Sequence, residues 1–493
     1  MVGLVAFPFP SRLIMQLFVP NVSADSSDNG VAFAFTDDRL HFSRTAATRK
    51  EPQWFLALAI LVFVVLSSAA CRKARIEPLT ITFMDPGWSH DTSARSIISE
   101  QNLQEFRKET GIRVEHVPAP ETSLQQLALL RDLLHQGGSN PDVYGIDIVW
   151  PALLDQDLLD LKSQFANQLA SMDPDLVSAY TVNGKVVAVP YQTNVGVLLY
   201  RRDLLEKYGY QSPPRNWNEL EQMALRIQQG ERKAGVKDFW GFVWAGAAGE
   251  ALTCQGLEWQ LSEGGGQIIE PDGVVTVNNP NAIGAWQRAK HWIGWISSPS
   301  VTSYEEWDSI NIFEHSAKAA FRRSWMSDYF LSHAAPSQVT RKLGVSSVPA
   351  GANGEVAVLG GFGLSVSRTS AHPQEAVALV RFLLRKEEEL EAQRRQGPMP
   401  TNTKVYSLPA VLKAYARPEL GTLDKRSQVV SRPSSLAGAE YENVSRAYAQ
   451  ALHSVLTGET PAPQAAAKLE SQLSQITSSQ KRVSAQPGQS RIQ

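Results

Sequence analysis

From residue 76 onward the hydrophobic and polar positions follow two periods in turn, one typical of strands and one of helices. The segments of the first stretch are strand 79–84, helix 93–111, strand 112–117, helix 123–138 and a short apolar run 143–150. Gly111 is a plausible stop for the first helix. The last run is typical of a buried parallel strand. This β-α-β-α-β order predicts a parallel sheet covered by helices.

The same alternation returns in the second half of the chain. A strand and a short helix are expected over 195–209, with Asp203 as the cap and Gly209 as the stop. The next helix lies in 212–230, where Asn216 can cap it and Gly230 can end it. A strand over 354–367 then leads into a helix opened by Ser370 and Pro373. Two successive α/β units are therefore expected.

A segment, 51–71, precedes these elements and ends at Cys71; its residues 52–71 carry no charge. Positive residues stand before it, its centre "WFLALAILVFVVL" is apolar, and small residues lead up to the cysteine, as in a secretory signal. The position of Cys71 resembles a bacterial lipobox, although Ser68 stands where Leu is usual. The alternative is an uncleaved membrane anchor, because about 20 uncharged residues just span a bilayer. Both readings place the rest of the chain outside the cytoplasm, at a membrane.

The two ends of the chain are expected to lie outside the fold. Residues 1–50 have no strong period, and we interpret them as a non-structured leader or the result of a start codon placed too far upstream. Residues 477–493 are polar and broken by Pro and Gly, so disorder is expected there. The remaining 400 or so residues are too many for one core and suit two lobes. Cys254 is the one other thiol, so a large core rather than disulfides must stabilise the protein.

Composition and motifs narrow the function classes. The net charge is −2 and basic residues are dispersed, which argues against nucleic-acid binding. The sequence has no GxxxxGK[ST], GxSxG, HExxH or CxxC motif, and its nine histidines form no pair at metal-ligand spacing. No cofactor or metal is expected. A glycosidase needs only two carboxylates, which no short motif reveals, so an enzyme stays open at this point.

Eleven of the twelve tryptophans follow residue 76. For most of them a place in the core is the plainer interpretation. An indole can also cover the apolar C–H face of a sugar ring, while Asp, Asn, Gln and Arg read the surrounding hydroxyls. The tryptophan content is therefore compatible with carbohydrate binding.

Five segments resemble the family 1 extracellular solute-binding proteins, closest to the trehalose/maltose-binding group that serves ABC importers. They are 140–161, 189–220, 241–259, 319–330 and 359–370, in the family's order. The likeness runs from about residue 78 to about 470. It implies a two-lobed periplasmic-binding-protein fold of class II, each lobe a mostly parallel sheet flanked by helices, with several crossovers at the hinge.

The resemblance also implies domain limits and partners. The N-terminal lobe would take 76–188 with 350–400, and the C-terminal lobe 192–346 with 404–476. A disaccharide or short oligosaccharide would bind between the lobes and favour their closed state. The partners would be that sugar and the permease and ATPase subunits of the importer. The protein would be a monomer without catalytic activity.

Several contacts of the family can be carried to matching residues of the first lobe and the hinge. Asp147 matches an acid that takes sugar hydroxyls, or else it caps a turn. Gln126 matches a polar contact of the same lobe, or else it is a solvated helix position. Asn194 stands where many members have Asp, and its amide can still donate and accept. Tyr191 either contacts the ligand or packs in the hinge.

Four further matches come from the later part of the chain. Trp325 matches the tryptophan that stacks on the sugar. Gly361 and Phe362 match a Gly-aromatic step at which the backbone approaches the ligand and a ring closes the pocket. Arg432 matches an arginine that reaches the cleft, where its fork can hold two hydroxyls or pair with Asp147. Two other functions stay open: an extracellular enzyme acting on carbohydrate, and a tethered sugar sensor.

Overall fold

The computed structural model describes residues 78–87, 96–120, 122–135, 141–334, 337–390, 399–403, 407 and 428–484. The expected leader 1–50, the segment 51–71 and Cys71 lie outside the described residues. In the described part, no helix combines the length and the apolarity needed to cross a lipid bilayer. The elements below all belong to one compact unit, Glu77–Gln493.

The first stretch confirms the predicted alternation. Its elements are β1 (Thr80–Met84), α2 (Glu100–Thr110), β2 (Arg113–Val117), α3 (Ser123–His135) and β3 (Val143–Asp147). Strand β1 pairs in parallel with both β2 and β3. Helix α2 begins later than expected because Ser99 and Asn102 form a capping box, and it ends at Gly111, whose φ of 76° suits a residue without Cβ.

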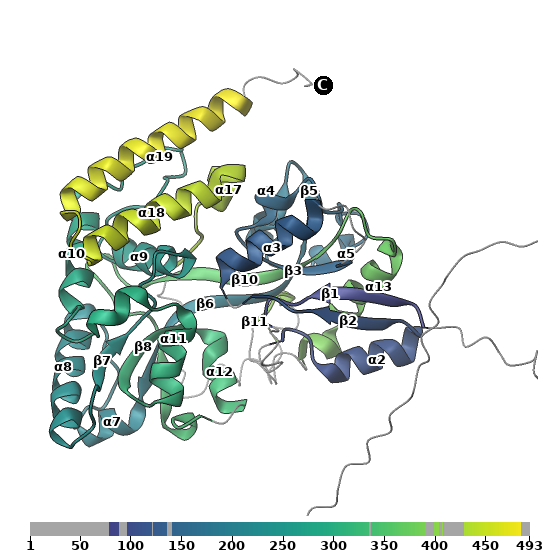
Figure 1. Ribbon diagram of the computed structural model, residues 1–493. Coiled ribbons are helices and arrows are strands. Elements are labelled where there is room, and N and C mark those ends of the chain that lie inside the picture. The colour runs from purple at the N-terminus through teal and green to yellow at the C-terminus, as the bar shows by residue number, and fades with distance from the viewer. Residues whose placement is uncertain are drawn as a thin grey trace, which may run out of the picture. The chain divides into compact units, whose positions relative to one another are not determined.

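Two long strands run through the middle of the sheet. They are β6 (Val189–Arg201) and β10 (Val356–Val366), and they pair antiparallel. With β8 (Ala319–Trp325) and β7 (Trp240–Val243), the strand order is β2-β1-β3-β10-β6-β8-β7. Figure 1 shows β6 and β10 side by side between the β1-β2-β3 group and the β7-β8 group.

The sheet is more mixed than the expected pair of mostly parallel sheets. Parallel pairing holds within β2-β1-β3 and between β7 and β8. Strand β10 runs antiparallel to β3, and β6 runs antiparallel to β8. The direction of these two strands follows from long-range connections, which the local hydrophobic pattern does not encode.

Short strands complete the sheet near its middle. Strand β9 (Leu343–Ser346) and β11 (Met399–Pro400) pair with β6, and β12 (Gln428–Val430) pairs in parallel with β10. Strands β4 (Thr181–Val182) and β5 (Lys185–Val186) form a separate hairpin. Segments far apart in the sequence thus meet beside β6 and β10, where the pocket described below is found.

Two local predictions in the second half are wrong. Asp203 does not cap α7 (Arg202–Lys207); its carboxylate accepts hydrogen bonds at 2.8 and 2.7 Å from the guanidinium of Arg201. Gly230 does not end α8 (Trp217–Lys233), although Asn216 caps that helix as expected. Gly230 lies inside the helix, and a Cβ there would lie 2.2 Å from the Tyr208 ring. The glycine therefore leaves room for that ring to pack against α8.

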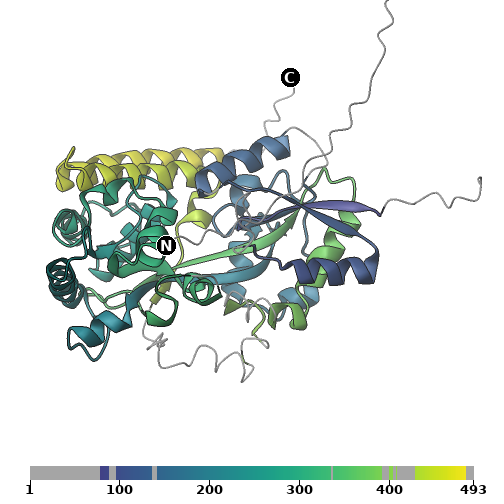
Figure 2. The ribbon, with the colours of Figure 1, turned by 60° about the horizontal axis from the view of Figure 1, so that its bottom comes forward.

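The remaining helices cover the sheet and form the C-terminal layer. They are α4 (Pro151–Leu154), α5 (Ala166–Leu169), α6 (Pro174–Ala179), α9 (Glu250–Ser262), α10 (Pro280–Trp292), α11 (Glu306–Ile310), α12 (Met326–Ala334), α13 (Pro373–Leu383), α17 (Ser434–Ala437), α18 (Tyr441–Leu456) and α19 (Ala462–Ser484). Figure 2 shows α18 and α19 lying next to each other at the yellow end of the chain. Because α19 reaches Ser484, the tail predicted to be disordered from residue 477 is helical over 477–484; residues 485–493 lie outside the described part.

Most of the tryptophans belong to the core, as the plainer interpretation held. Six of the ten that the structure describes after residue 76 are almost fully buried: Trp150, Trp217, Trp244, Trp259, Trp286 and Trp292. Trp292 contacts three of the others, with ring centroids 5.3 to 6.5 Å apart. Cys254 is buried and unpaired. A second apolar cluster lies under β1, α2 and α13 and includes Phe83, Phe106 and Phe382.

Candidate functional site

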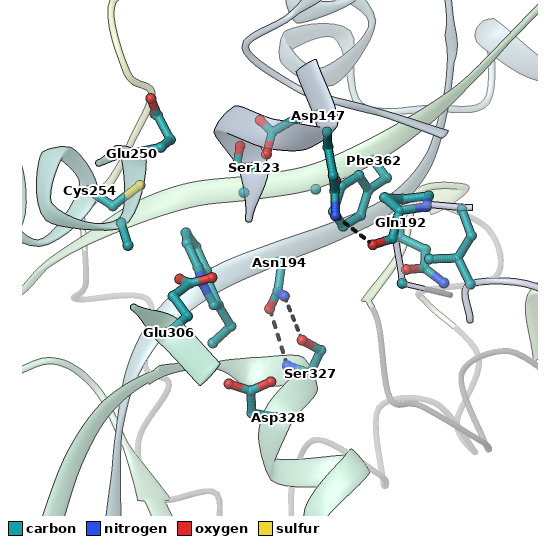
Figure 3. Close-up of a pocket in the computed structure, with 18 of the residues that line it drawn as sticks. Ser123, Asp147, Gln192, Asn194, Glu250, Cys254, Glu306, Ser327, Asp328 and Phe362 are labelled. Carbon is teal, nitrogen blue, oxygen red and sulfur yellow. Dashed lines mark hydrogen bonds between the residues drawn. The ribbon is translucent and has the colours of Figure 1, made fainter. Parts of the chain in front are cut away.

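A cavity of about 390 Å³ opens beside β6 and β10. Its walls come from both sides of these strands: α3 and the ends of β1 and β3 on one, and α9, α11 and α12 on the other. Figure 3 shows Asn194 between the two walls, with Asp147 and Ser123 on one side and Glu306 and Asp328 on the other. The volume lies within the range of small-molecule sites.

Seven of the eight residues singled out from the sequence line this cavity. They are Gln126, Asp147, Asn194, Trp325, Gly361, Phe362 and Arg432. Tyr191 does not: it is buried in the core that includes Val189 and Leu364, and its hydroxyl donates to the carbonyl of Ile97 at 3.3 Å. Side chains of a strand alternate between faces, so Tyr191 points away from its neighbour Gln192, which does line the cavity.

Arg432 links the two walls. Its Nη2 donates to Oδ1 of Asp147 at 3.1 Å, and its Nη1 donates to Oε1 of Glu250 at 2.7 Å. Asp147 stands at the end of β3 and Glu250 at the start of α9, so one guanidinium connects residues from opposite sides. The Nε of Arg432 is buried and has no hydrogen-bond partner among the described residues. The two bonds use two of the five N–H groups of the guanidinium, so one hydrogen on Nη1 and one on Nη2 are left for further acceptors.

Asp147 fixes a turn, which is one of the two roles expected for it. Its Oδ1 also accepts a hydrogen bond at 3.1 Å from the backbone N–H of Val149, which fixes the turn after β3. Its Oδ2 accepts no hydrogen bond from the described residues, so it can accept one from a ligand. Burial raises the pKa of Asp147, while the charge of Arg432 opposes that rise and Glu250 adds to it.

Glu250, which was not anticipated from the sequence, lines the cavity and accepts hydrogen bonds from three donors. Oε1 accepts from Arg432 and from the hydroxyl of Tyr441, and Oε2 accepts from Ser445 at 2.6 Å. Tyr441 and Ser445 lie on α18, so the C-terminal layer orients this carboxylate. Nothing in the local pattern of "AGAAGEAL" distinguishes Glu250 from any acidic residue in the first turn of a helix.

Trp325 ends β8 at the cavity and is fixed by polar contacts. Its Nε1 donates to Oε1 of Glu306 at 2.6 Å. The guanidinium of Arg323 lies 4.3 Å from the centroid of the indole, in a cation–π arrangement. Arg323 in turn donates to both carboxylate oxygens of Glu258, at 2.9 and 2.7 Å. The indole is thus held in one orientation before any ligand arrives.

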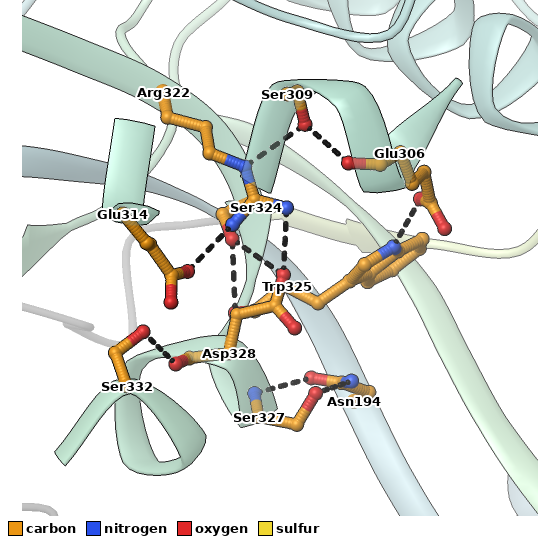
Figure 4. A network of polar contacts seen from close by, with 10 residues as sticks. All are labelled: Asn194, Glu306, Ser309, Glu314, Arg322, Ser324, Trp325, Ser327, Asp328 and Ser332. Carbon is orange, nitrogen blue, oxygen red and sulfur yellow. Dashed lines mark hydrogen bonds and ion pairs between the residues drawn. The ribbon is translucent and has the colours of Figure 1, made fainter. Parts of the chain in front are cut away.

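A buried network around Arg322 positions the elements on either side of Trp325 (Figure 4). Arg322 donates to Ser309 at 3.0 Å, to Glu314 at 3.2 Å and to Asp328 at 2.9 Å. These contacts tie β8 to α11, to the π-helical turn Asn311–His315 and to α12. Glu306 and Asp328, which line the cavity, belong to two of the elements tied in this way.

Asn194 is more constrained than the sequence suggested. Its Nδ2 donates to the Ser327 hydroxyl at 2.8 Å, and its Oδ1 accepts from the backbone N–H of Ser327 at 3.2 Å and of Val195 at 3.1 Å. The amide therefore anchors the first turn of α12 to β6. One amide hydrogen of Nδ2 is left for a ligand.

Gln126 also has a scaffold role. Its Nε2 donates to the carbonyls of Pro86 and Pro120, at 2.9 and 2.7 Å, so both amide hydrogens join loops of the cavity wall. Only its Oε1 is left to accept a hydrogen bond from a ligand. The alternative of a solvated helix position is wrong, because Gln126 is buried.

The glycines of β10 allow close approach of the backbone. Gly361 has a φ of 146°, and a Cβ there would lie 2.3 Å from the carbonyl oxygen of Gln192. At Gly360, which was not singled out, a Cβ would lie 2.8 Å from the ring of Trp325. The pairing of β10 with β6 shifts register between Phe362 and Gly363. The Gly-Gly-Phe step thus admits the indole and breaks the strand pairing at the cavity.

The chemistry of the cavity suits binding. Cys254 lines it, but burial raises the pKa of this thiol, which keeps it protonated and a poor nucleophile. Among the described residues, no three His, Cys, Asp or Glu side chains gather so that they could hold a metal ion. What remains is an indole, amides and carboxylates around a concave surface, which can hold a polar ligand with apolar faces.

Comparison with known proteins agrees with this description. Residues 89–389 match the model of the family described as bacterial extracellular solute-binding protein. A chain of Deinococcus radiodurans described as a probable ABC transporter-binding protein is 39% identical over 421 residues, which cover 85% of this chain and 98% of that one.

Solved structures share the fold. Maltose-bound MalE3 of T. maritima matches with a TM-score of 0.73 and 31% identity, over 81% of this chain and all of that one. An ABC transporter solute-binding protein of Thermotoga lettingae, solved with α-D-tagatose, matches with a TM-score of 0.71 and 21% identity over 81% of this chain and all of that one. The mixed α/β architecture is thus the periplasmic-binding-protein fold of MalE-type structures.

Proposed function

The chain belongs to the family of bacterial extracellular solute-binding proteins, and we propose that it captures a disaccharide or short oligosaccharide of the maltose or trehalose kind for an ABC importer. One observation carries the proposal. Trp325, held in place by Glu306 and Arg323, lines a cavity that also contains the fork of Arg432 on Asp147. An indole near the carboxylate of Asp147 suits a sugar ring, whose C–H face is apolar and whose rim is hydroxylated.

The proposed ligand contacts follow from the donors and acceptors that the protein leaves unused. Oδ2 of Asp147 and Oε1 of Gln126 can accept from hydroxyls, and the remaining Nη hydrogens of Arg432 and Nδ2 of Asn194 can donate to them. Similarity gives the second support, because the T. maritima protein was solved with maltose. The trehalose-like alternative rests on the sequence resemblance alone.

In this proposal the fold works as two lobes, 76–188 with 350–400 and 192–346 with 404–476, that close on the sugar. The two strand groups on either side of β6 and β10 support that division. A ligand shifts an open–closed equilibrium only as far as it binds the closed state better. Arg432 bonds to Asp147 on one wall and to Glu250 on the other, so both bonds can form together only when the lobes are closed.

We further propose that the protein works outside the cytoplasm, tethered to the membrane through an acylated Cys71 or an uncleaved segment 51–71. Mass spectrometry of the mature N-terminus distinguishes the two, since a lipoprotein would begin at an acylated Cys71. Solute-binding proteins of ABC transporters are non-catalytic, so the alternative function of an extracellular enzyme acting on carbohydrate is not supported.

Titration calorimetry of the purified chain with a panel of di- and trisaccharides tests the function. We expect one saccharide to bind with a stoichiometry of about one and to be recovered unchanged. Neither heat nor a thermal shift from any member of the panel would reject the sugar assignment. Release of reducing ends from the bound saccharide would instead support an enzyme.

A further inference from the structure

The charged side chains that line the cavity are unequal in sign. Four carboxylates line it: Asp147, Glu250, Glu306 and Asp328. Among the lining residues that the structure describes, Arg432 is the one cationic side chain. Four negative charges against one positive charge leave a formal charge of −3 on the wall.

The guanidinium groups behind the wall do not offset this charge. Arg322 pairs with Asp328 but also with Glu314, which is not part of the wall. Arg323 is fully matched by Glu258. Among the described residues, neither of these two guanidinium groups adds net positive charge to the wall.

Glu306 is the carboxylate with the least compensation. Oε1 accepts one hydrogen bond, from the indole N–H of Trp325, and no Lys, Arg or His of the described residues forms an ion pair with it. Its neighbours Glu305 and Asp308 are themselves acidic and do not line the cavity. Glu306 therefore presents a negative charge beside the surface proposed to hold the sugar ring.

We propose that the cavity favours a saccharide that carries a protonated amine, with its ammonium group facing Glu306, and that it discriminates against uronic acids and sugar phosphates. The inference rests on the function proposed above and adds the charge class of the ligand. A cation near an unpaired carboxylate in a partly desolvated cavity is stabilised, whereas an anion is repelled by the same field.

The test is a set of maltose analogues measured by calorimetry at pH 7. One hydroxyl at a time is replaced by an amine, and the matching uronic acid carries a carboxylate instead of a hydroxymethyl group. We expect at least one amine to bind ~10-fold tighter than maltose and the uronic acid to bind at least ~10-fold more weakly. If no amine binds more tightly than maltose, or if the uronic acid binds as well as maltose, the inference is overturned while the sugar-binding function stands.

The variant Glu306→Gln assigns the effect to one residue. Glutamine keeps an oxygen for the Trp325 N–H, so the indole keeps its support while the charge is lost. We expect the preference for the best amine over maltose to fall to within ~2-fold. The control Glu305→Gln makes the same change of charge one residue away and should retain most of the preference. An unchanged preference in Glu306→Gln, or an equal loss in both variants, contradicts the assignment. Failure of every saccharide to bind the unaltered protein overturns the proposed function, and the inference falls with it.

Discussion

Two buried arginines beside the cavity, Arg323 and Arg432, differ in how their guanidinium groups are paired with carboxylates. Arg323 gives two hydrogen bonds to the single carboxylate of Glu258, and both partners are almost fully buried. Arg432 divides its fork between Asp147 and Glu250 from opposite walls, and its Nε has no partner among the described residues. The first pair is complete and supports Trp325. The second is incomplete, because Arg432 lines the cavity and its Nη groups keep hydrogens that a ligand can accept. Within one site, Arg323 thus supports the wall, whereas Arg432 is placed to contact a ligand.

Breaking the complete pair should have the largest effect on stability. In Glu258→Ala, Arg323 becomes a buried guanidinium without its carboxylate, and we expect a loss of roughly 3–5 kcal/mol in the free energy of unfolding. Urea denaturation measures the loss. The control Glu109→Ala breaks the exposed pair with Arg385 and should cost less than ~1 kcal/mol. Equal losses in the two variants would contradict the assignment of Arg323 to structural support.

Glu389 is a buried carboxyl that has no arginine partner among the described residues. Burial raises the pKa of Glu389 to about 8, and the nearby Thr401 hydroxyl lowers it only in part. The folded state then holds a proton that the unfolded state releases near pH 4.5, so stability should fall as pH rises from about 4.5 to about 8. At about 1.4 kcal/mol per pKa unit the fall amounts to a few kcal/mol.

The variant Glu389→Gln should remove this part of the pH dependence. Denaturation midpoints at pH 5 and pH 8 are the measurement, with Glu375→Gln on the preceding helix α13 as the control. The unaltered protein and the control should lose more stability between the two pH values than Glu389→Gln does. Parallel curves for all three would show that Glu389 ionises normally in the folded state.

Shortening the incomplete fork should weaken binding. Arg432→Lys keeps the charge but cannot reach Asp147 and Glu250 together in the planar geometry of a guanidinium. We expect a loss in saccharide binding of about 1.5–3 kcal/mol, the range of a hydrogen bond to a charged group. Calorimetry measures the affinity, and Arg385→Lys on the protein surface serves as the control. Unaltered affinity in Arg432→Lys would mean that the fork is structural, like that of Arg323.

The smallest predicted effect concerns the indole. Trp325→Ala should lower affinity by at least ~1 kcal/mol, because an aromatic contact contributes about that much beyond its area. The matched control is Trp240→Ala: the guanidinium of Arg232 also lies 4.3 Å from that ring, but Trp240 does not line the cavity. If both variants bind the saccharide as well as the unaltered protein, the stacking role is rejected.

The local periods were sufficient to predict most elements before residue 150, and the resemblance named seven residues that line the cavity. The resemblance also anticipated the pairing of Arg432 with Asp147. The direction of β6 and β10, and the pairing of Arg432 with Glu250, depend on segments far apart in the sequence, which no local pattern contains. For Tyr191, the strand period of two already favours packing, one of its two expected roles, because it separates Tyr191 from Gln192 and Asn194. Glu250 and Glu306 carry no such signal, because each is an ordinary acidic residue in the first turn of a helix.

A crystal structure of the protein with its saccharide would show the ligand contacts themselves. We expect a sugar ring stacked on the indole of Trp325, with hydroxyls on Oδ2 of Asp147 and on the Nη groups of Arg432. A saccharide bound elsewhere on the chain, with the cavity beside β6 and β10 filled by side chains, would contradict this expectation.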